Sequence, residues 1–121
     1  MAFRFGLIGA GGAAALHVPA MRMLPGIEVA AIADVDRSRA EEIATRYAIP
    51  EVFESTEALL ANASVEALAV LSPHHMHLAA VRLAAERGVH VLVEKALAPT
   101  AEDADRMVEI CKRHQVVLGG V

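Results

Sequence analysis

The chain has 121 residues, enough for one domain whose buried core needs no disulfide or metal. Its formal net charge of −4 argues against sequence-independent nucleic-acid binding, which requires a basic surface. The single cysteine excludes an internal disulfide, and no uncharged stretch has the length of a membrane span. We therefore expect a cytoplasmic protein without membrane or nucleic-acid partners.

The first half of the chain alternates short apolar runs with helical patterns. We expect strands at residues 3–9, 27–33 and 51–53. The helix between the first two, at 13–23, contains Pro19, which predicts a break near His17-Val18 because proline lacks an N–H and disfavours helix at the preceding residue. Asp36 is placed to cap the next helix, whose buried face should hold Ala40, Ile43, Ala44 and Tyr47.

The second half continues the alternation. Ser55 is placed to cap a short helix through Ala61, and further strands are expected at 67–71 and 89–93, with a sixth strand beginning at 116–118. Gly88 should end the helix before the fifth strand, and Thr100 should cap a helix with the apolar stripe Ala104, Met107, Val108 and Cys111. This order predicts an α/β fold with a doubly wound parallel (Rossmann) sheet of about six strands and helices on both faces, as one domain over residues 1–121.

A glycine-rich loop follows the first expected strand. The stretch GAGGAA, residues 9–14, matches G-x-G-x-x-G/A, the pattern of a dinucleotide-binding turn. Glycine at the first position allows the tight turn, glycine at the second lets the backbone approach a pyrophosphate, and alanine at the third lets helix and strand pack closely. An unused glycine turn is the alternative. The candidate cofactor residues are Gly9, Gly11, Gly12, Ala13 and Ala14.

Asp34 ends the second expected strand, 20 residues beyond Ala14, where the fold places an acid that binds the adenosine ribose. Its carboxylate can accept bonds from both ribose hydroxyls and would repel a 2′-phosphate, so NAD is expected rather than NADP. Arg37 and Arg39 follow closely and would invert this preference if they reached the phosphate.

Two more groups of polar residues follow strands. The stretch SPHHMH, residues 72–77, comes after the fourth strand, and Glu94-Lys95 comes after the fifth. Both belong at the carboxyl edge of the sheet, where open α/β folds bind ligands. The histidines lack a nearby cysteine or carboxylate, so no metal site is expected. Without the other motifs, Lys95 would be interpreted as a surface lysine paired with Glu94.

These motifs together resemble a known family. GAGGAA with His17 downstream, AIADVD, SPHHMH and GVHVLVEKALA are similar to the N-terminal domain of the Gfo/Idh/MocA oxidoreductases (glucose–fructose oxidoreductase, inositol 2-dehydrogenase, rhizopine catabolism), over all 121 residues. The resemblance implies an NAD(P)-dependent oxidoreductase acting on a secondary hydroxyl, or the matching ketone, of a sugar, cyclitol or similar polyol.

The resemblance also implies roles for single residues. Glu94 would contact the nicotinamide ribose, and His77, which would start the helix beside that pocket, is expected to contact the cofactor. Lys95 would be the active-site lysine, which helps to move the proton of the substrate hydroxyl as hydride passes to the nicotinamide. Three residues would border the nicotinamide and its ribose: Ser72, Pro73 and His74.

The chain departs from the family pattern in two places. Ala96 replaces the proline of the usual Glu-Lys-Pro triplet, which puts the geometry of Lys95 in question. The family also carries a second α/β domain, which forms the substrate pocket and often an oligomer interface, after the sixth strand. Since Val121 lies near that point, we expect the cofactor half of an oxidoreductase, inactive alone and able to self-associate. The alternative is a non-catalytic nucleotide-binding or sensor module that acts through a partner protein.

Overall fold

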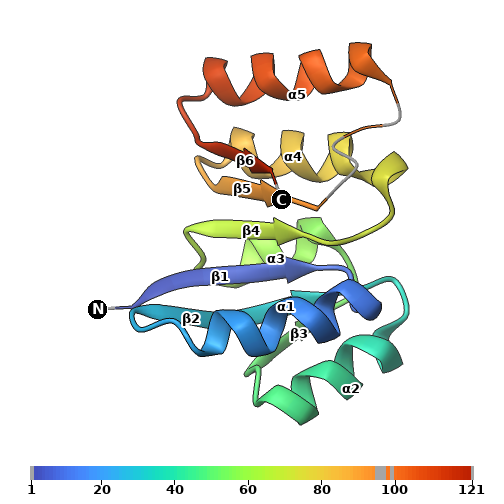
Figure 1. The fold of residues 1–121 in the computed structure, drawn as a ribbon, viewed down its shortest axis with the longest axis vertical. Helices are drawn as coiled ribbons and strands as arrows, with labels where there is room; N and C mark the ends of the chain where they lie inside the picture. Colours follow the sequence, from blue (N-terminus) through green and yellow to red (C-terminus); the bar gives the residue numbers. More distant parts are fainter. Residues whose placement is uncertain (1, 95–97, 99, 121) are drawn as a thin grey trace.

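A six-stranded parallel sheet forms the centre of the molecule (Figure 1), as the sequence predicted. The computed structural model describes residues 2–94, 98 and 100–120. The strand order is β3-β2-β1-β4-β5-β6. Successive strands are added on one side of β1 as far as β3, and then on its other side from β4 onward, so the switch point of the sheet lies between β1 and β4. The strands are β1 (Phe3–Ile8), β2 (Ile27–Ala33), β3 (Glu51–Phe53), β4 (Ala67–Val70), β5 (His90–Val93) and β6 (Leu118–Gly120).

Helices cover the sheet from both sides. One face packs against α1 (Gly12–Arg22) and α2 (Arg37–Tyr47), and the other packs against α3 (Thr56–Asn62), α4 (His77–Glu86) and α5 (Ala101–Arg113). A short 3-10 turn, η1 (His74–Met76), precedes α4 and was not predicted. None of the helices in the described ranges is both long and apolar enough to cross a membrane.

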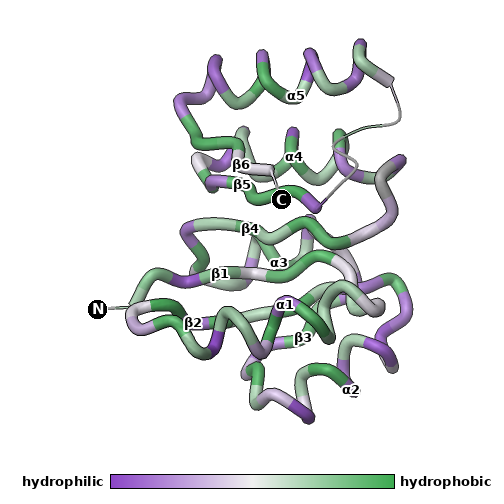
Figure 2. Tube along the Cα trace, in the orientation of Figure 1, coloured by the Kyte–Doolittle hydropathy of each residue, from purple (hydrophilic) through white to green (hydrophobic). Residues whose placement is uncertain are grey.

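The core consists of two layers, because neighbouring strand residues point to opposite faces. In β1, Leu7 belongs to the layer under α1 and α2, whereas Ile8 belongs to the layer under α4 and α5. All four residues of β4 are buried, as a central strand covered on both faces requires. Figure 2 shows α5 alternating between hydrophilic and hydrophobic residues, which fits one buried side and one solvent side.

The predicted helix caps are confirmed. The side chains of Asp36, Ser55 and Thr100 each accept hydrogen bonds from backbone N–H groups at the starts of α2, α3 and α5. Gly88 follows the end of α4 with φ +72°, a conformation that glycine adopts without steric cost. These local signals therefore fix where the elements begin and end.

Two local predictions are wrong. The helix containing Pro19 does not break, because α1 runs from Gly12 to Arg22. Val18 and Met21, on either side of the proline, are buried in the core, and their packing offsets the cost of proline in a helix, about 3 kcal/mol. In α5, Val108 is 49% exposed, and Ile110 packs against the core instead. Met107 and Cys111 are buried as expected, and burial raises the pKa of the Cys111 thiol.

Candidate cofactor site

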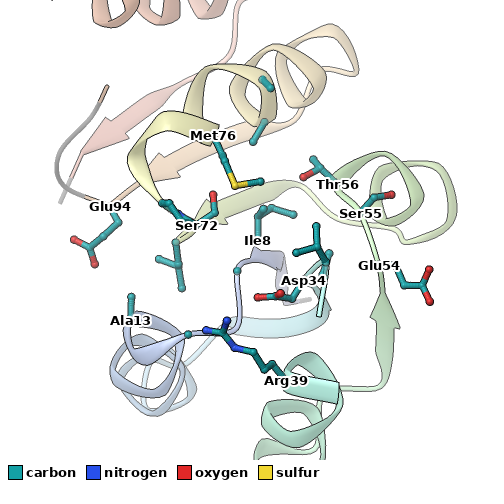
Figure 3. Close-up of a pocket in the computed structure, with 18 of the residues that line it drawn as sticks. Ile8, Ala13, Asp34, Arg39, Glu54, Ser55, Thr56, Ser72, Met76 and Glu94 are labelled. Atoms are coloured by element: carbon teal, nitrogen blue, oxygen red, sulfur yellow. The ribbon is translucent and has the colours of Figure 1, made fainter. Parts of the chain in front are cut away.

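A cavity of about 840 Å³ opens at the carboxyl edge of the sheet, where β1, β2, β3, β4 and β5 end. Its size falls within the range typical of sites for small molecules and cofactors. In Figure 3, Glu94 lies at one end of this cavity and Glu54 at the other, with Asp34 and Ser72 between them. The sheet thus brings together residues that are up to 86 positions apart in the sequence, from Ile8 to Glu94.

The glycine loop forms the floor of the cavity. Gly9 has φ +101°, and a Cβ atom built there would lie 2.8 Å from the backbone nitrogen of Ser72. Only glycine fits that conformation and that approach. At Gly11, a Cβ atom would meet the side chain of Arg39 at 2.9 Å, whereas Gly12 has open space around it. Gly9 therefore permits close contact with the loop after β4 as well as the predicted turn.

Asp34 is held against the glycine loop by its backbone partners. One carboxylate oxygen accepts from Ala10 N at 2.7 Å, and the other accepts from Asp36 N at 2.8 Å. A carboxylate has about four lone-pair positions, so two bonds leave it acceptor capacity at the cavity that Asp34 lines. The acid that the sequence placed at the end of the second strand is thus fixed at the pocket wall.

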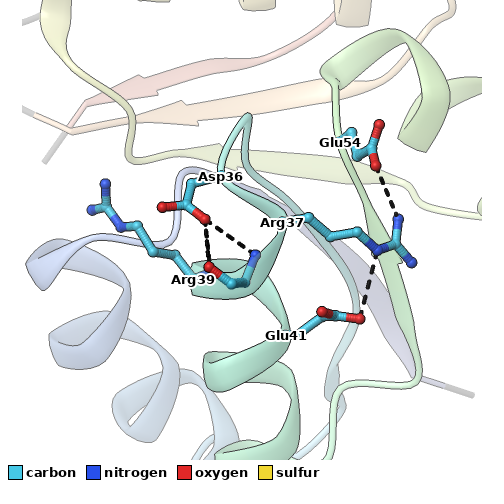
Figure 4. Close-up of polar contacts among 6 residues, drawn as sticks. Asp36, Arg37, Arg39, Glu41 and Glu54 are labelled. Atoms are coloured by element: carbon cyan, nitrogen blue, oxygen red, sulfur yellow. Dashed lines mark hydrogen bonds and ion pairs between the residues drawn. The ribbon is translucent and has the colours of Figure 1, made fainter.

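The two arginines at the start of α2 lie on different sides (Figure 4). Arg37 pairs with Glu41 at 3.5 Å and with Glu54 at 3.8 Å. Arg39 instead lines the cavity, with its guanidinium above Gly11. Only Arg39 of the two is therefore placed to meet a ligand over the glycine loop.

The loop after β4 supplies a buried hydroxyl and a buried imidazole. Ser72 lines the cavity, and its Oγ is buried with no hydrogen-bond partner among the residues that the structure describes. The ring Nε2 of His77 lies 2.7 Å from the carbonyl oxygen of Ser72. Pro73 also lines the cavity, whereas His77 is fully buried behind it.

Glu94 joins the site through a contact that the sequence did not predict. Its Oε2 lies 2.6 Å from Nε2 of His17, a half-buried residue of α1. An ionised carboxylate only accepts, so the imidazole donates this bond. His17 stood in the family resemblance without a role, because nothing in a single sequence pairs a helical histidine with a residue 77 positions away.

A second group that sequence reasoning missed follows β3. Four consecutive residues after Phe53 line the far end of the cavity: Glu54, Ser55, Thr56 and Glu57. The signal was present, because β3 was predicted and its carboxyl end must reach the same edge as the other parallel strands. Ser55 was considered only as a helix cap, which it also is.

The predicted site residues divide into three groups. Ala14 and His77 are buried and do not line the cavity; Ala14 packs between α1 and the sheet, as its motif position requires. Lys95 lies outside the described residues, as do Ala96 and the side chain of His74. The predicted residues that do line the cavity are Gly9, Gly11, Gly12, Ala13, Asp34, Arg39, Ser72, Pro73 and Glu94. Within the described ranges, no three side chains of histidine, cysteine or acidic residues converge as a metal site would need.

Comparison with known families accounts for this arrangement. The profile of the oxidoreductase family with an NAD-binding Rossmann fold matches residues 3–120. The chain belongs to the Gfo/Idh/MocA oxidoreductase family. It therefore forms an NAD-binding Rossmann domain of the kind that this family shares, as its motifs indicated.

Named relatives of this Gfo/Idh/MocA domain include two sugar or cyclitol dehydrogenases. Inositol 2-dehydrogenase 1 of Saccharopolyspora erythraea is 36% identical over 124 residues, covering 99% of this chain and 37% of that protein. D-xylose 1-dehydrogenase (NADP(+)) 2 of Haloferax volcanii is 37% identical over 114 residues, covering 94% of this chain and 35% of that protein. The chain spans about a third of the length of the curated relatives it matches.

Solved structures of longer relatives superpose closely. The WlbA dehydrogenase from Bordetella pertussis, crystallised with NADH and UDP-GlcNAcA, matches with a TM-score of 0.95 at 29% identity, covering 100% of this chain and 37% of that one. An oxidoreductase from Agrobacterium radiobacter, in complex with NAD+, L-tartaric acid and magnesium, matches with a TM-score of 0.96 at 26% identity, over 99% of this chain and 35% of that one.

Proposed function

We propose that this domain binds NAD(H) along the cavity, as the cofactor half of a dehydrogenase. The observation that carries the proposal is that one cavity joins the glycine loop, the anchored carboxylate of Asp34 and the carboxylate of Glu94. The glycine loop and the acid after β2 are the groups that a dinucleotide needs for its pyrophosphate and its adenosine ribose. The family resemblance assigns Glu94 to the nicotinamide ribose. The WlbA complex with NADH has the same domain fold, which supports the assignment.

The residues present fit such a ligand. Ser72 lines the cavity, and its buried Oγ has no partner among the described residues, so a ligand that bonds to this hydroxyl would stabilise it. At the glycine loop, Gly12 leaves open space at the N-terminus of α1, where backbone N–H groups favour an anion. The site thus offers polar groups where a dinucleotide presents its own.

Asp34 supports NAD over NADP. Its carboxylate keeps acceptor capacity for ribose hydroxyls and would repel a 2′-phosphate. Glu54 and Glu57 line the same end of the cavity and add negative charge there. Arg37, which would favour the phosphate, is engaged by Glu41 and Glu54. Arg39 also lines the cavity, and its positive charge would favour a 2′-phosphate and so NADP. One relative is named as NADP(+)-dependent.

The reaction proposed for the whole protein is dehydrogenation of a secondary hydroxyl in a sugar, cyclitol or similar polyol. A bound nicotinamide ring supplies the hydride acceptor for that chemistry. The chain's own part is to hold the cofactor with Gly11, Asp34 and Ser72. By family resemblance, Lys95 takes the proton of the substrate hydroxyl. Relatives named for inositol and xylose support this substrate class.

These 121 residues alone are proposed to be inactive, because substrate positioning supplies much of an enzyme's rate enhancement.

The test of the proposed reaction uses the domain joined to the substrate domain of an inositol dehydrogenase relative. NAD+ with a panel of cyclitols and sugars should give NADH absorbance, and Lys95→Ala should abolish it. Cofactor binding without turnover of any polyol, and indifference to Lys95→Ala, would favour a sensor module.

A further inference from the structure

His77 is buried at the first position of α4, yet its ring reaches back to the loop before the helix. The side chain is completely inaccessible, and its Nε2 lies 2.7 Å from the carbonyl oxygen of Ser72. A carbonyl oxygen only accepts hydrogen bonds, so Nε2 must carry a proton and donate. The bond therefore fixes which ring nitrogen is protonated as well as the position of the carbonyl.

Ser72 is the residue through which this bond acts on the cavity. Its backbone nitrogen and Cα lie 2.8 Å and 3.0 Å from where a Cβ atom of Gly9 would be, so the loop after β4 packs directly against the glycine loop. Its Oγ is buried in the cavity wall without a partner among the described residues. A shift of the Ser72 peptide would thus move both this hydroxyl and its contact with Gly9.

The backbone hydrogen bonds on either side of Ser72 do not link its carbonyl to α4. Leu71 N donates to Ile8 O at 2.7 Å, which holds the strand side of the loop in the sheet. Met76 N donates to Pro73 O at 2.9 Å within the 3-10 turn. Met76, the residue that caps α4, makes no side-chain capping bond. The His77 bond is therefore the described link from the Ser72 carbonyl to the start of α4.

We propose that His77 is a positioning residue for the nicotinamide half of the cavity, acting through the Ser72 carbonyl. This inference rests on the proposed function, because it assumes that the Ser72 end of the cavity receives the nicotinamide riboside. It replaces the expectation that His77 contacts the cofactor itself. The ring lies behind the loop, where it sets the loop's shape and touches no ligand.

Three substitutions separate a positioning role from simple core packing. His77→Gln places an amide N–H near the position of Nε2, whereas His77→Asn places it near Nδ1, and His77→Leu fills the space without a donor. Each variant is titrated with NADH and with ADP, which shares the adenosine end and the pyrophosphate but lacks the nicotinamide riboside. Thermal unfolding of each variant is measured alongside, with the exposed His114→Gln as control.

We expect His77→Leu and His77→Asn to weaken NADH binding about tenfold while ADP binding changes less than about threefold, since one lost hydrogen bond is worth about 1.4 kcal/mol. His77→Gln should restore most of the NADH affinity. Equal losses for both ligands, or no rescue by glutamine, would overturn the positioning role. If the unsubstituted domain binds neither ligand, the proposed function fails; if it binds both and the variants match it, only this inference fails.

A measurement on the unsubstituted domain covers the case in which the variants do not fold. Nitrogen-15 NMR of the histidine rings reports which nitrogen carries the proton. The geometry requires a protonated, slowly exchanging Nε2 at His77. A neutral ring protonated only at Nδ1 would contradict the bond to Ser72 and with it the proposal.

Discussion

The imidazole of His17 and the carboxylate of Glu94 meet at 2.6 Å between Nε2 and Oε2. Their side chains are only 21% and 19% exposed, so the contact is partly shielded from water. The contact links α1, which follows the glycine loop, to the end of β5, which lies on the other side of the switch point between β1 and β4. Glu94 lines the cavity, so a residue on a different element helps to hold its carboxylate at the site.

Removing His17 should loosen Glu94 within the cavity. We expect His17→Ala to raise the Kd for NADH about fivefold and to lower the free energy of unfolding by about 1 kcal/mol, because a partly shielded hydrogen bond to a charged group is lost. His17→Gln, which retains an N–H donor, should keep most of both. Fluorescence titration and thermal unfolding measure the two effects. Equal NADH affinity in His17→Ala and the unsubstituted domain would contradict the role given to this pair.

Gly9 should be the least replaceable glycine of the loop. Gly9→Ala forces a side chain into φ +101° and to within 2.8 Å of Ser72 N, so we expect a loss of roughly 2 kcal/mol or more in the free energy of unfolding. Gly12→Ala is the matched control, since a Cβ atom there would have nothing within 4 Å and alanine favours a helix. Denaturant unfolding that finds the two variants equally stable would exclude this explanation.

Cofactor choice should depend on Asp34 and Arg39 in opposite ways. Asp34→Asn should weaken NADH binding about tenfold and bring NADH and NADPH affinities closer, because the anionic acceptor is lost. Arg39→Ala should weaken NADPH more than NADH. Arg37→Ala, on the same helix but paired with Glu41 and Glu54, is the control and should change neither much. Competitive titration with both cofactors measures these ratios, and a larger effect from Arg37 than from Arg39 would refute them.

Asp36 should give the domain an acid-sensitive component of stability. The hydroxyl of Ser38, with backbone N–H groups of α2, holds the pKa of this carboxyl below its ordinary value of 3.8. A group whose pKa is lowered on folding stabilises the folded state above the ordinary pKa and loses that contribution as pH falls through the folded-state value.

The comparison with Asp36→Asn isolates that component, because asparagine also caps helices but does not ionise. The difference in free energy of unfolding between the unsubstituted chain and the Asp36→Asn variant, from denaturant unfolding, should shrink from about pH 6 to about pH 3. A difference that stays constant or grows on acidification would be inconsistent with the lowered pKa.

Much of the fold follows from local signals. The β4 run ALAV is apolar on both faces, so it could only be a covered central strand, and Asp36, Ser55 and Thr100 mark helix starts by a side-chain bond to a nearby N–H. Once the parallel order is known, strand ends converge on one edge. For that reason Gly11, Asp34, Ser72 and Glu94 could be assigned to one site from the sequence.

The rest depends on tertiary contacts that local patterns do not contain. Pro19 is tolerated because Val18 and Met21 are buried beside it, and neither proline rules nor spacing report that packing. The partner of His17 lies 77 residues away. His77 stands in a motif that suggests cofactor contact, yet its ring is turned to the Ser72 carbonyl behind the pocket. In each case the residue stands out in the sequence, but its contacts are known only from the tertiary structure.

Direct titration of this domain with NADH, followed by nicotinamide fluorescence and by calorimetry, tests the central claim most directly. Saturable binding at one site per chain is expected, with NADPH binding more weakly and Gly11→Val abolishing both. The glycine substitution places a branched side chain against Arg39 and over the loop where the pyrophosphate is assigned. The absence of saturable binding at millimolar NADH, or an unchanged affinity in Gly11→Val, would contradict the assignment of this cavity as a dinucleotide site.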